Sequence, residues 1–232
     1  MASALAAAGF AAIGTTSLGV SAAHGLPDGE EQGKDQTLAL VRALRDRLDV
    51  PLTVDVAGGF GSSPHELAAY AQALHDSGAA GLNLEDGRPG GALAQPRDQA
   101  ALIAAVKARV PAMFVNARTD TYWLPGADRS ETLPRLRTYL KAGADGVFVP
   151  AVSDPAEIRA LTTALDAPLN VLLLPGMTVP ALAALGVARI STGSLLFRVA
   201  LDTAVRTARA IAAGEPAPDG VLSYAEVNAL SA

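Results

Sequence analysis

A repeated order of short apolar runs and helical segments constrains the fold of this chain more than any other feature of its sequence. The apolar runs are residues 12–14, 52–56, 81–84, 112–116, 146–149, 169–174 and 188–191. They are almost continuously apolar, as strands are when both faces of their sheet are buried. The segments between them carry apolar residues at helical spacing, such as Leu38, Val41, Leu44 and Leu48. Strands that alternate with helices predict parallel strands joined by helical crossovers.

Capping residues and glycines mark where the predicted helices begin and end. Residues 63–66 read Ser-Pro-His-Glu, which combines an N-cap, a proline at the first helical position and a capping-box glutamate, and residues 154–157 repeat the pattern. The glycines that end helices just before the apolar runs are Gly9, Gly78, Gly143 and Gly186. Glycine is favoured there because the left-handed conformation that ends a helix carries no steric penalty without a Cβ.

The number of predicted elements leaves two α/β architectures open. We count seven strands and eight helices, beginning with a helix, and a further short helix over residues 222–230. They fit either a (β/α)8 TIM-type barrel that lacks its first strand or an open doubly wound sheet. No nucleotide-type glycine fingerprint follows any strand, so we favour the barrel, as one domain over residues 1–232. We expect the first helix to pack beside the gap, and the exposed edge to be covered in an oligomer or else to make the protein poorly soluble.

Charge and composition exclude several kinds of function. The formal net charge is −5 and the basic residues are scattered, so we expect no nucleic-acid partner and no membrane binding. The chain has no cysteine, which excludes disulfides, thiolate zinc sites and a cysteine nucleophile. The first ten residues are too short for a membrane span and lack the basic start of a signal peptide, so we expect a cytoplasmic protein.

Polar residues follow the predicted strands, where parallel α/β folds bind their ligands. They are Thr15, Thr16, Ser17 and Asp28 after the first strand, Asp55 after the second, Glu85 and Asp86 after the third, Asn116, Arg118 and Asp120 after the fourth, and Thr192, Gly193 and Ser194 after the seventh. Asp28, Asp55 and Glu85 converge on one rim, where like charges are unfavourable unless something positive lies among them. A bound Mg²⁺ ion, or Mn²⁺ in its place, would supply this positive charge. The alternative is that these acids cap helices or pair with arginines.

Two further features of this rim each allow two interpretations. The planar fork of Arg118 suits bidentate binding of a substrate carboxylate, but it equally suits a structural pair with Asp120 or Glu85. The glycine-rich residues 87–91 have almost no helical or strand propensity. They fit a lid over the site or an ordinary surface loop.

Five segments, in order along nearly the whole chain, resemble the motifs of one enzyme superfamily. They are residues 7–13 with 16–21 and 25–28, residues 51–55 with 58–61, residues 81–86, residues 116–120 and residues 142–146. Together they resemble the phosphoenolpyruvate mutase/isocitrate lyase superfamily, in a phosphonomutase-like form. The resemblance covers the superfamily and does not select one reaction.

The resemblance implies a barrel that holds Mg²⁺ beside a small oxo-acid and works through an enolate-like species. Asp55 would contact the metal, while Glu85 and Asp28 would hold its waters. The predicted catalytic residues are Arg118, Asp28 and Thr16, and the predicted substrate-binding residues are Ser17, Leu18, Arg118 and Asn116. Ser17 and Leu18 would act through backbone amides that grip the substrate carboxylate with Arg118. The resemblance also implies a homo-oligomer, a dimer or a tetramer.

Three departures from the superfamily pattern narrow the reaction. Ala57 stands where the metal-binding strand usually has a second aspartate, and Pro150 stands where the mutase branch has a histidine. Residues 87–94 contain no cysteine, lysine or histidine, whereas the lyase branch has a Lys-Lys/Arg-Cys-Gly-His motif with a catalytic cysteine. These departures argue against a standard isocitrate or 2-methylisocitrate lyase and against a standard mutase.

The sequence therefore predicts a Mg²⁺-dependent enzyme that acts on a small oxo-acid. The reaction would be a C–C bond lyase or hydrolase reaction, or a P–C bond mutase or hydrolase reaction. One alternative is a degenerate barrel that binds a carboxylate without turnover. Another is an unrelated barrel that binds phosphate at residues 192–194, at the start of the last long helix.

Overall fold

Seven parallel strands form the centre of the molecule, and each pairs with the next one along the chain. The computed structural model describes residues 1–28 and 33–230. The strands are β1 (Ile13–Gly14), β2 (Leu52–Asp55), β3 (Ala79–Glu85), β6 (Phe114–Arg118), β7 (Gly146–Val149), β8 (Leu169–Leu172) and β9 (Arg189–Ser191), hydrogen-bonded in that order. A doubly wound sheet would reverse its strand order at a switch point. The sequential order therefore confirms the predicted barrel.

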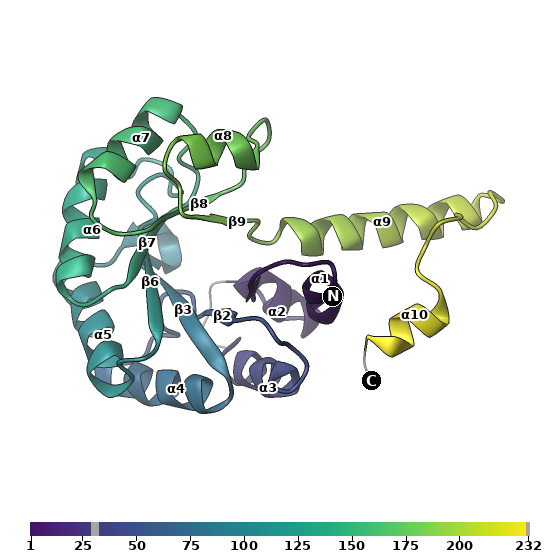
Figure 1. The fold of residues 1–232 in the computed structure, drawn as a ribbon, viewed down its shortest axis with the longest axis horizontal. Helices are drawn as coiled ribbons and strands as arrows, with labels where there is room; N and C mark the ends of the chain where they lie inside the picture. The colour runs from purple at the N-terminus through teal and green to yellow at the C-terminus, as the bar shows by residue number, and fades with distance from the viewer. Residues whose placement is uncertain (29–32, 231–232) are drawn as a thin grey trace.

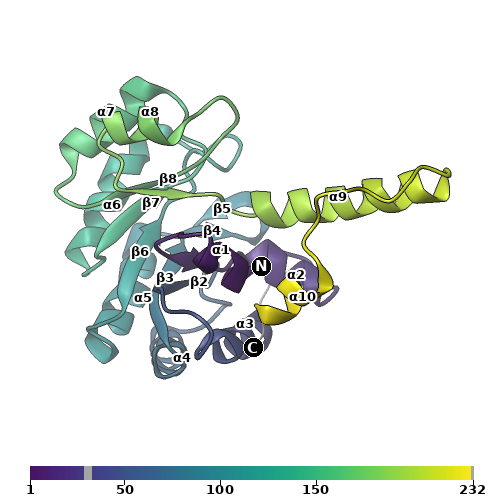
Figure 2. The ribbon, with the colours of Figure 1, turned by 45° about the vertical axis from the view of Figure 1, so that its right-hand side comes forward.

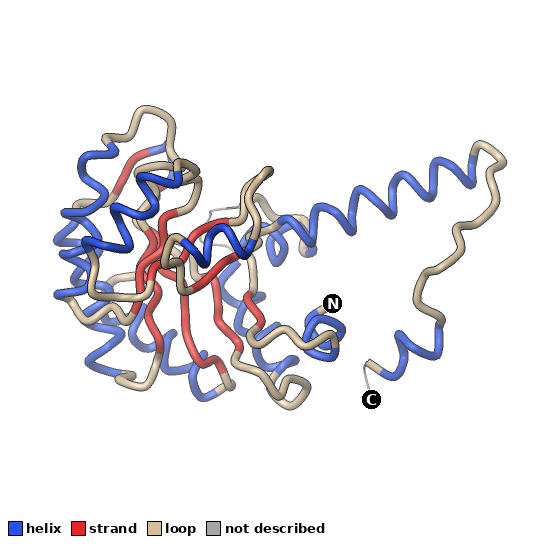
Figure 3. Tube along the Cα trace, turned by 45° about the horizontal axis from the view of Figure 1, so that its top comes forward, coloured by secondary structure: helices blue, strands red, loops and turns tan. Residues whose placement is uncertain are grey.

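The barrel is nearly closed and lacks one strand. The strands curl around a common centre, and β1 and β9 are the two edges of the sheet formed by the described residues (Figure 3). The first helix, α1 (Ala2–Ala7), packs beside β1, with Ala2 and Leu5 against the core. The predicted gap, and the place of the first helix beside the first strand, are thus both present.

Six helices cover the outer face of the sheet, so that the main core lies between helices and strands (Figure 1). They are α3 (Lys34–Leu44), α4 (Pro64–Asp76), α5 (Pro96–Arg109), α6 (Thr132–Lys141), α7 (Pro155–Ala164) and α8 (Val179–Ala184). Leu82, Ile103 and Leu136 are among the fully buried side chains of this layer. The predicted capping box of α4 is present at Ser63, and Gly78 ends the same helix with a φ of +99°.

Two local elements differ from the sequence prediction. The loop after β1 contains a short helix, α2 (Ser17–Ala23), and the glycine-rich segment forms a hairpin of β4 (Gly87–Arg88) and β5 (Ala92–Leu93) around the 3-10 turn η2 (Pro89–Gly91). Glycines 90 and 91 make this turn with positive φ angles of +81° and +79°. Weak local propensity is overridden here by tertiary contacts of Arg88, described below. A second 3-10 turn, η3 (Arg129–Glu131), precedes α6.

The helix after β9 leaves the barrel instead of packing on its outer face. This helix, α9 (Leu195–Ala212), projects away from the other elements, and α10 (Tyr224–Ala229) follows it at the end of an extended segment (Figures 1 and 2). None of the residues of α9 is buried. Among the described residues, no helix combines the length and hydrophobicity needed to cross a lipid bilayer.

Candidate functional site

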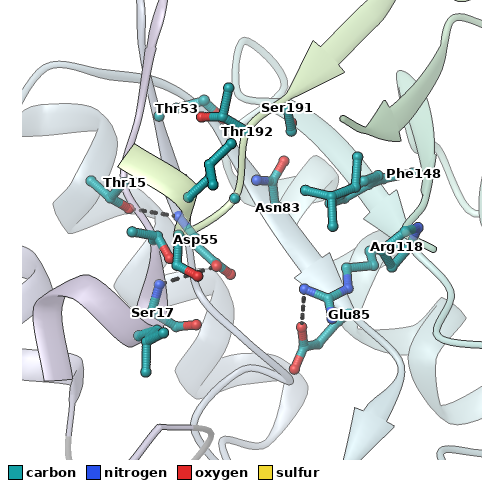
Figure 4. A pocket seen from close by; sticks show the side chains of 18 of the residues that line it. Thr15, Ser17, Thr53, Asp55, Asn83, Glu85, Arg118, Phe148, Ser191 and Thr192 are labelled. Carbon is teal, nitrogen blue, oxygen red and sulfur yellow. Dashed lines mark hydrogen bonds and ion pairs between the residues drawn. The ribbon is translucent and has the colours of Figure 1, made fainter. Parts of the chain in front are cut away.

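A cavity of about 1910 Å³ lies inside the barrel and includes the carboxyl ends of its strands. Asp55, Glu85 and Arg118 line it from three consecutive strands of the sheet (Figure 4). Thr16 and Leu18, from the first loop and the start of α2, also line it. Most of the site residues predicted from the sequence therefore line this cavity.

Backbone amides hold Asp55 in place at the end of β2. Its Oδ2 accepts a hydrogen bond from the Ser17 amide at 3.2 Å, and its Oδ1 accepts one from the Ala57 amide at 3.1 Å. The Asp55 amide donates to Thr15 Oγ1 at 2.9 Å, which ties β2 to the loop after β1 (Figure 4). The Ser17 amide, predicted to bind a substrate carboxylate, is thus directed at Asp55.

Ala57 links Asp55 to Glu85 through its backbone. Its φ is +46°, in the left-handed region that few non-glycine residues adopt. In this conformation the Ala57 amide donates to Asp55, while the Ala57 carbonyl accepts a hydrogen bond from the Glu85 amide at 2.9 Å. The position where a second aspartate was expected therefore still connects the two remaining acids.

Arg118 is paired with two carboxylates. Its Nη1 lies 2.8 Å from Glu85 Oε2, while Nε and Nη2 donate to the two oxygens of Asp120 at 2.6 and 3.2 Å. The guanidinium carbon also lies 5.7 Å from the ring centres of both Trp123 and Phe148. All three nitrogens of Arg118 are engaged, so the structural pairing considered from the sequence is present, and a role as carboxylate clamp stays a prediction.

Burial is the largest influence on the pKa values of these groups, and the neighbouring charges modify it. Burial raises the pKa of Glu85 to about 8; Arg118 opposes this shift, whereas Asp55, Asp120 and Asp28 add to it. Burial also raises the pKa of Asp120. Burial lowers the pKa of Arg118, but the surrounding carboxylates outweigh it and the net shift is upward. The rim is therefore an acidic cluster around one fixed cation.

Asp86 is a carboxylate next to the rim that holds the segment after β6 through hydrogen bonds. It is fully buried, and its Oδ1 accepts a hydrogen bond from the Asp120 amide at 2.8 Å. Its Oδ2 accepts hydrogen bonds from Thr119 Oγ1 at 2.8 Å, from Tyr139 Oη at 2.7 Å and from Arg135 Nη1 at 3.3 Å. Asp86 thereby joins the ends of β3 and β6 to α6 and fixes the segment that carries Arg118 and Asp120.

The hairpin β4–β5 is anchored at its base. Arg88 Nη1 donates to the carbonyls of Glu85 and Gly87 at 2.9 and 2.8 Å, and its Nη2 donates to Gln99 Oε1 at 2.8 Å. Gln99 is fully buried and donates in turn to the Glu85 carbonyl at 3.0 Å. These bonds favour a fixed wall of the site over a moving lid.

The structure does not bring every predicted residue to the cavity. Asn116 is almost fully buried, its Nδ2 donates to Asn83 Oδ1 at 2.9 Å, and it does not line the cavity. The reason is that β6 runs to Arg118, two residues beyond the predicted end, so Asn116 sits inside the strand. Asp28 lines the cavity from the first loop, as expected. Arg189 of β9 also lines the cavity, although it was not among the site residues predicted from the sequence.

The sequence profile of the phosphoenolpyruvate phosphomutase family matches residues 1–212. The chain belongs to this family. An uncharacterized protein of Mycobacterium tuberculosis strain H37Rv is 45% identical over 224 residues, which cover 96% of this chain and 84% of the relative. The 2-methylisocitrate lyase of Escherichia coli strain K12 is 34% identical over 173 residues, which cover 70% of this chain and 58% of the lyase.

A solved structure extends the phosphoenolpyruvate phosphomutase family comparison to three dimensions. The structure of phosphonopyruvate hydrolase in complex with oxalate and Mg²⁺ matches with a TM-score of 0.87 at 25% identity, over 99% of this chain and 85% of that one. Relatives in this superfamily include lyases, mutases and hydrolases, so this chain is a member of an enzyme family. The resemblance inferred from the five motifs is confirmed, and the alternative of an unrelated phosphate-binding barrel is wrong.

The raised pKa of Glu85 predicts a specific pH dependence of stability. A folded-state pKa near 8, above the ordinary value of 4.5, means that the protonated form favours folding. Its contribution is complete below pH 4.5 and is lost as the pH rises to 8. Without divalent cations, the melting temperature of Glu85→Gln should therefore rise relative to wild type between pH 5 and pH 9. We expect a relative gain of at least about 3 °C, which corresponds to about 1 kcal/mol in a domain of this size.

Scanning calorimetry across this pH range measures the effect, with Glu215→Gln beyond the exposed end of α9 as the control. A difference between Glu85→Gln and wild type that stays constant from pH 5 to pH 9 would contradict the raised pKa.

Proposed function

We propose that this protein is a Mg²⁺-dependent enzyme that acts on a small oxo-acid through an enolate-like species. The reaction is cleavage or hydrolysis of a C–C bond, or rearrangement or hydrolysis of a P–C bond. The observation that carries the proposal is the convergence of Asp55, Glu85 and Arg118 in one cavity at the carboxyl ends of the barrel strands, in a member of this family. The phosphonopyruvate hydrolase that binds oxalate and Mg²⁺ supports the same assignment.

The rim residues fit a divalent cation that keeps most of its water ligands. Asp55 and Glu85 are hard oxygen donors, and Arg118, which pairs with Glu85 and Asp120, makes no ion pair with Asp55 within the described residues. Within residues 1–28 and 33–230, no three acidic or histidine side chains gather closely enough to complete a metal site. Mg²⁺ is often held by one or two carboxylates and several waters. We assign Asp55 as its direct ligand and Glu85 and Asp28 to its waters, with Mn²⁺ as a substitute.

The bound cation would stabilise the negative charge that develops on the oxygen of an oxo-acid. The chain itself would then orient the substrate. A Glu85 side chain bound to the waters of the cation would leave Nη1 of Arg118 available to a substrate carboxylate, while Asp120 would keep the guanidinium in place. The amide of Leu18 adds a donor at the start of α2, and Thr16 and Asp28 supply further polar side chains to the cavity.

A carboxylate-binding protein without turnover is the second candidate. The observation in its favour is that Arg118 is fully engaged by Glu85 and Asp120 while Ala57 removes one expected acid. Both candidates share the binding step, and they differ in whether a bound oxo-acid is converted.

Thermal unfolding with Mg²⁺ and oxalate tests the metal site. We expect wild type to gain about 2.7 kcal/mol of stability at a hundredfold excess over the dissociation constant. Asp55→Ala should abolish the Mg²⁺-dependent part of this gain, because it removes the assigned ligand. His75→Ala, on α4, should retain it and serves as the control. Equal stabilisation of wild type and Asp55→Ala would show that the cation is held elsewhere.

The chain lacks the cysteine that lyases of this superfamily use as an acid. We expect no isocitrate or 2-methylisocitrate lyase activity, because cleavage leaves an enolate or aci-acid that must be protonated at carbon. The lyase branch uses its cysteine for this step, as the family resemblance implies, and this chain has none. The hairpin offers Arg88, which is effectively never deprotonated. Loss of one positioned acid typically slows a reaction by about 10²–10⁴-fold.

Coupled assays for glyoxylate and pyruvate, with the E. coli 2-methylisocitrate lyase as a positive control, measure this activity. Product release from either substrate at a rate comparable with that lyase would overturn the prediction.

We also propose that the protein is a homo-oligomer joined through α9. The α9 stripe, defined as Leu201, Ala204, Val205, Ala208 and Ile211, has the spacing of one helical face and is exposed to solvent. Arg198, Asp202, Arg206 and Arg209 form a charged face beside this stripe. A second copy of the chain is the fitting partner, because its own barrel edge beside β9 lacks the helix that would follow this strand.

The oligomer proposal predicts dissociation when the α9 stripe becomes charged. Leu201→Asp combined with Val205→Asp should give a monomer in sedimentation velocity, because an apolar contact cannot bury two carboxylates without a large desolvation cost. Arg206→Asp changes charge on the side of α9 away from the stripe and should leave the oligomer intact. Wild type that sediments as a monomer at micromolar concentration would reject the proposal.

A further inference from the structure

The guanidinium of Arg88 donates its hydrogen bonds to neutral acceptors at the end of β3. Nη1 lies 2.9 Å from the Glu85 carbonyl and 2.8 Å from the Gly87 carbonyl, and Nη2 lies 2.8 Å from Oε1 of Gln99. Arg118, the arginine at the rim, contacts two carboxylates instead. Among the described residues Arg88 thus pairs with no acid, and what it fixes is the backbone where β3 ends.

The backbone of Glu85 is held on both sides by groups outside its own strand. Glu85 is the last residue of β3, and its amide donates to the Ala57 carbonyl at 2.9 Å. Its carbonyl accepts hydrogen bonds from Arg88 at 2.9 Å and from Nε2 of Gln99 at 3.0 Å. The direction of a side chain at a strand end follows from its backbone. These bonds therefore determine where the Glu85 carboxylate enters the cavity.

Close packing against Gly58 keeps the Arg88 guanidinium in this place. Gly58 follows Ala57 in the loop after β2, and both Gly58 and Arg88 line the cavity. A Cβ atom at Gly58 would lie 2.6 Å from Nη1 of Arg88 and 3.1 Å from the Gly87 carbonyl oxygen. Only glycine permits so close an approach. Nη2 meets Gln99, which is fully buried on α5, so Arg88 connects the loop after β2 to α5 across the end of β3.

We propose that Arg88 is a positioning residue of the metal site, where it holds the backbone of Glu85 so that the carboxylate reaches the waters of the cation. This inference rests on the proposed function, in which Asp55 binds the cation and Glu85 binds its waters. Arg88 belongs to the hairpin β4–β5, so the same bonds make the hairpin a fixed part of the site. The acidic half of the site is therefore in place before any oxo-acid arrives.

Electron paramagnetic resonance of Mn²⁺ with the full chain, in the absence of any oxo-acid, tests this assignment, because the signal of the free ion falls as the ion binds. Arg88→Met keeps an unbranched apolar side chain and removes all of the donors. We expect it to bind Mn²⁺ about threefold to tenfold more weakly than wild type, less than for a residue that bonds a metal ligand directly through its side chain. The spectrum of the bound ion should also change, whereas a loss of stability alone would leave that spectrum as in wild type.

Gly58→Ala disrupts the same contact from the loop after β2. Its added methyl group would displace Nη1 of Arg88, so it should weaken Mn²⁺ binding by a similar factor, and combining it with Arg88→Met should add little. Arg88→Lys keeps the charge without the planar fork and should give an intermediate loss. Arg137→Met, at an exposed position of α6, is the matched control and should bind as wild type does. Should Arg88→Met fail to fold, Gly58→Ala and Arg88→Lys still decide the question.

Other results would overturn the inference while the metal site stands. Equal affinity of Arg88→Met and wild type would show that Glu85 is held without Arg88, and tighter binding would show that Arg88 acts only through its positive charge. Full additivity of Gly58→Ala and Arg88→Met would show that the two residues act independently. Mn²⁺ binding by wild type only when oxalate is present would also overturn the inference and leave the metal-dependent function intact. Wild type that binds no Mn²⁺, with or without oxalate, would overturn both.

Discussion

Negative charge crowded at the ends of β2, β3 and β6 is the constraint on which the site depends. Three carboxylates, of Asp55, Glu85 and Asp120, lie around the single guanidinium of Arg118. Such crowding raises the pKa of buried acids and opposes folding unless each charge is held. Arg118 pairs with two of these acids, and the backbone amides of Ser17 and Ala57 donate hydrogen bonds to Asp55. The neighbouring carboxylate of Asp86 is paired with Arg135 of α6. Asp55 has no ion-pair partner among the described residues, and it is the ligand assigned to the proposed cation.

The barrel itself could be predicted because buried parallel strands appear in the sequence as short apolar runs between helical segments. The strands are mostly apolar, and a glycine such as Gly78 or Gly143 precedes the next one. The hairpin at residues 87–93 and the helix α2 could not be predicted in this way. The hairpin depends on Arg88 reaching Gln99, eleven residues away and on a different element, and no local pattern announces such a contact.

Less of the site than of the fold could be predicted, for a reason that lies in side-chain direction. Asp55 and Glu85 were identifiable because the last residue of a strand is placed by the strand itself. Asn116 was expected at the end of β6, but the strand continues for two residues to Arg118, so Asn116 lies on the same face deeper in the barrel, where it bonds Asn83. Arg189 escaped notice because it lies in a run of otherwise apolar residues, and three residues of strand are too few to show which face turns inward.

The unpaired edges of β1 and β9 give the cavity one stiff wall and one compliant wall. Backbone groups that face the seam have no ladder partner among the described strands, so widening the barrel there breaks no inter-strand hydrogen bond. Local opening of this kind costs less free energy than global unfolding, and amides at the seam exchange hydrogen with solvent sooner than those of the central strands. The residues of the rim belong to β2, β3 and β6, whereas Arg189 belongs to β9, one of the two edge strands. Breathing of the barrel therefore changes the distance from β9 to the rim, while the distances among Asp55, Glu85 and Arg118 stay fixed.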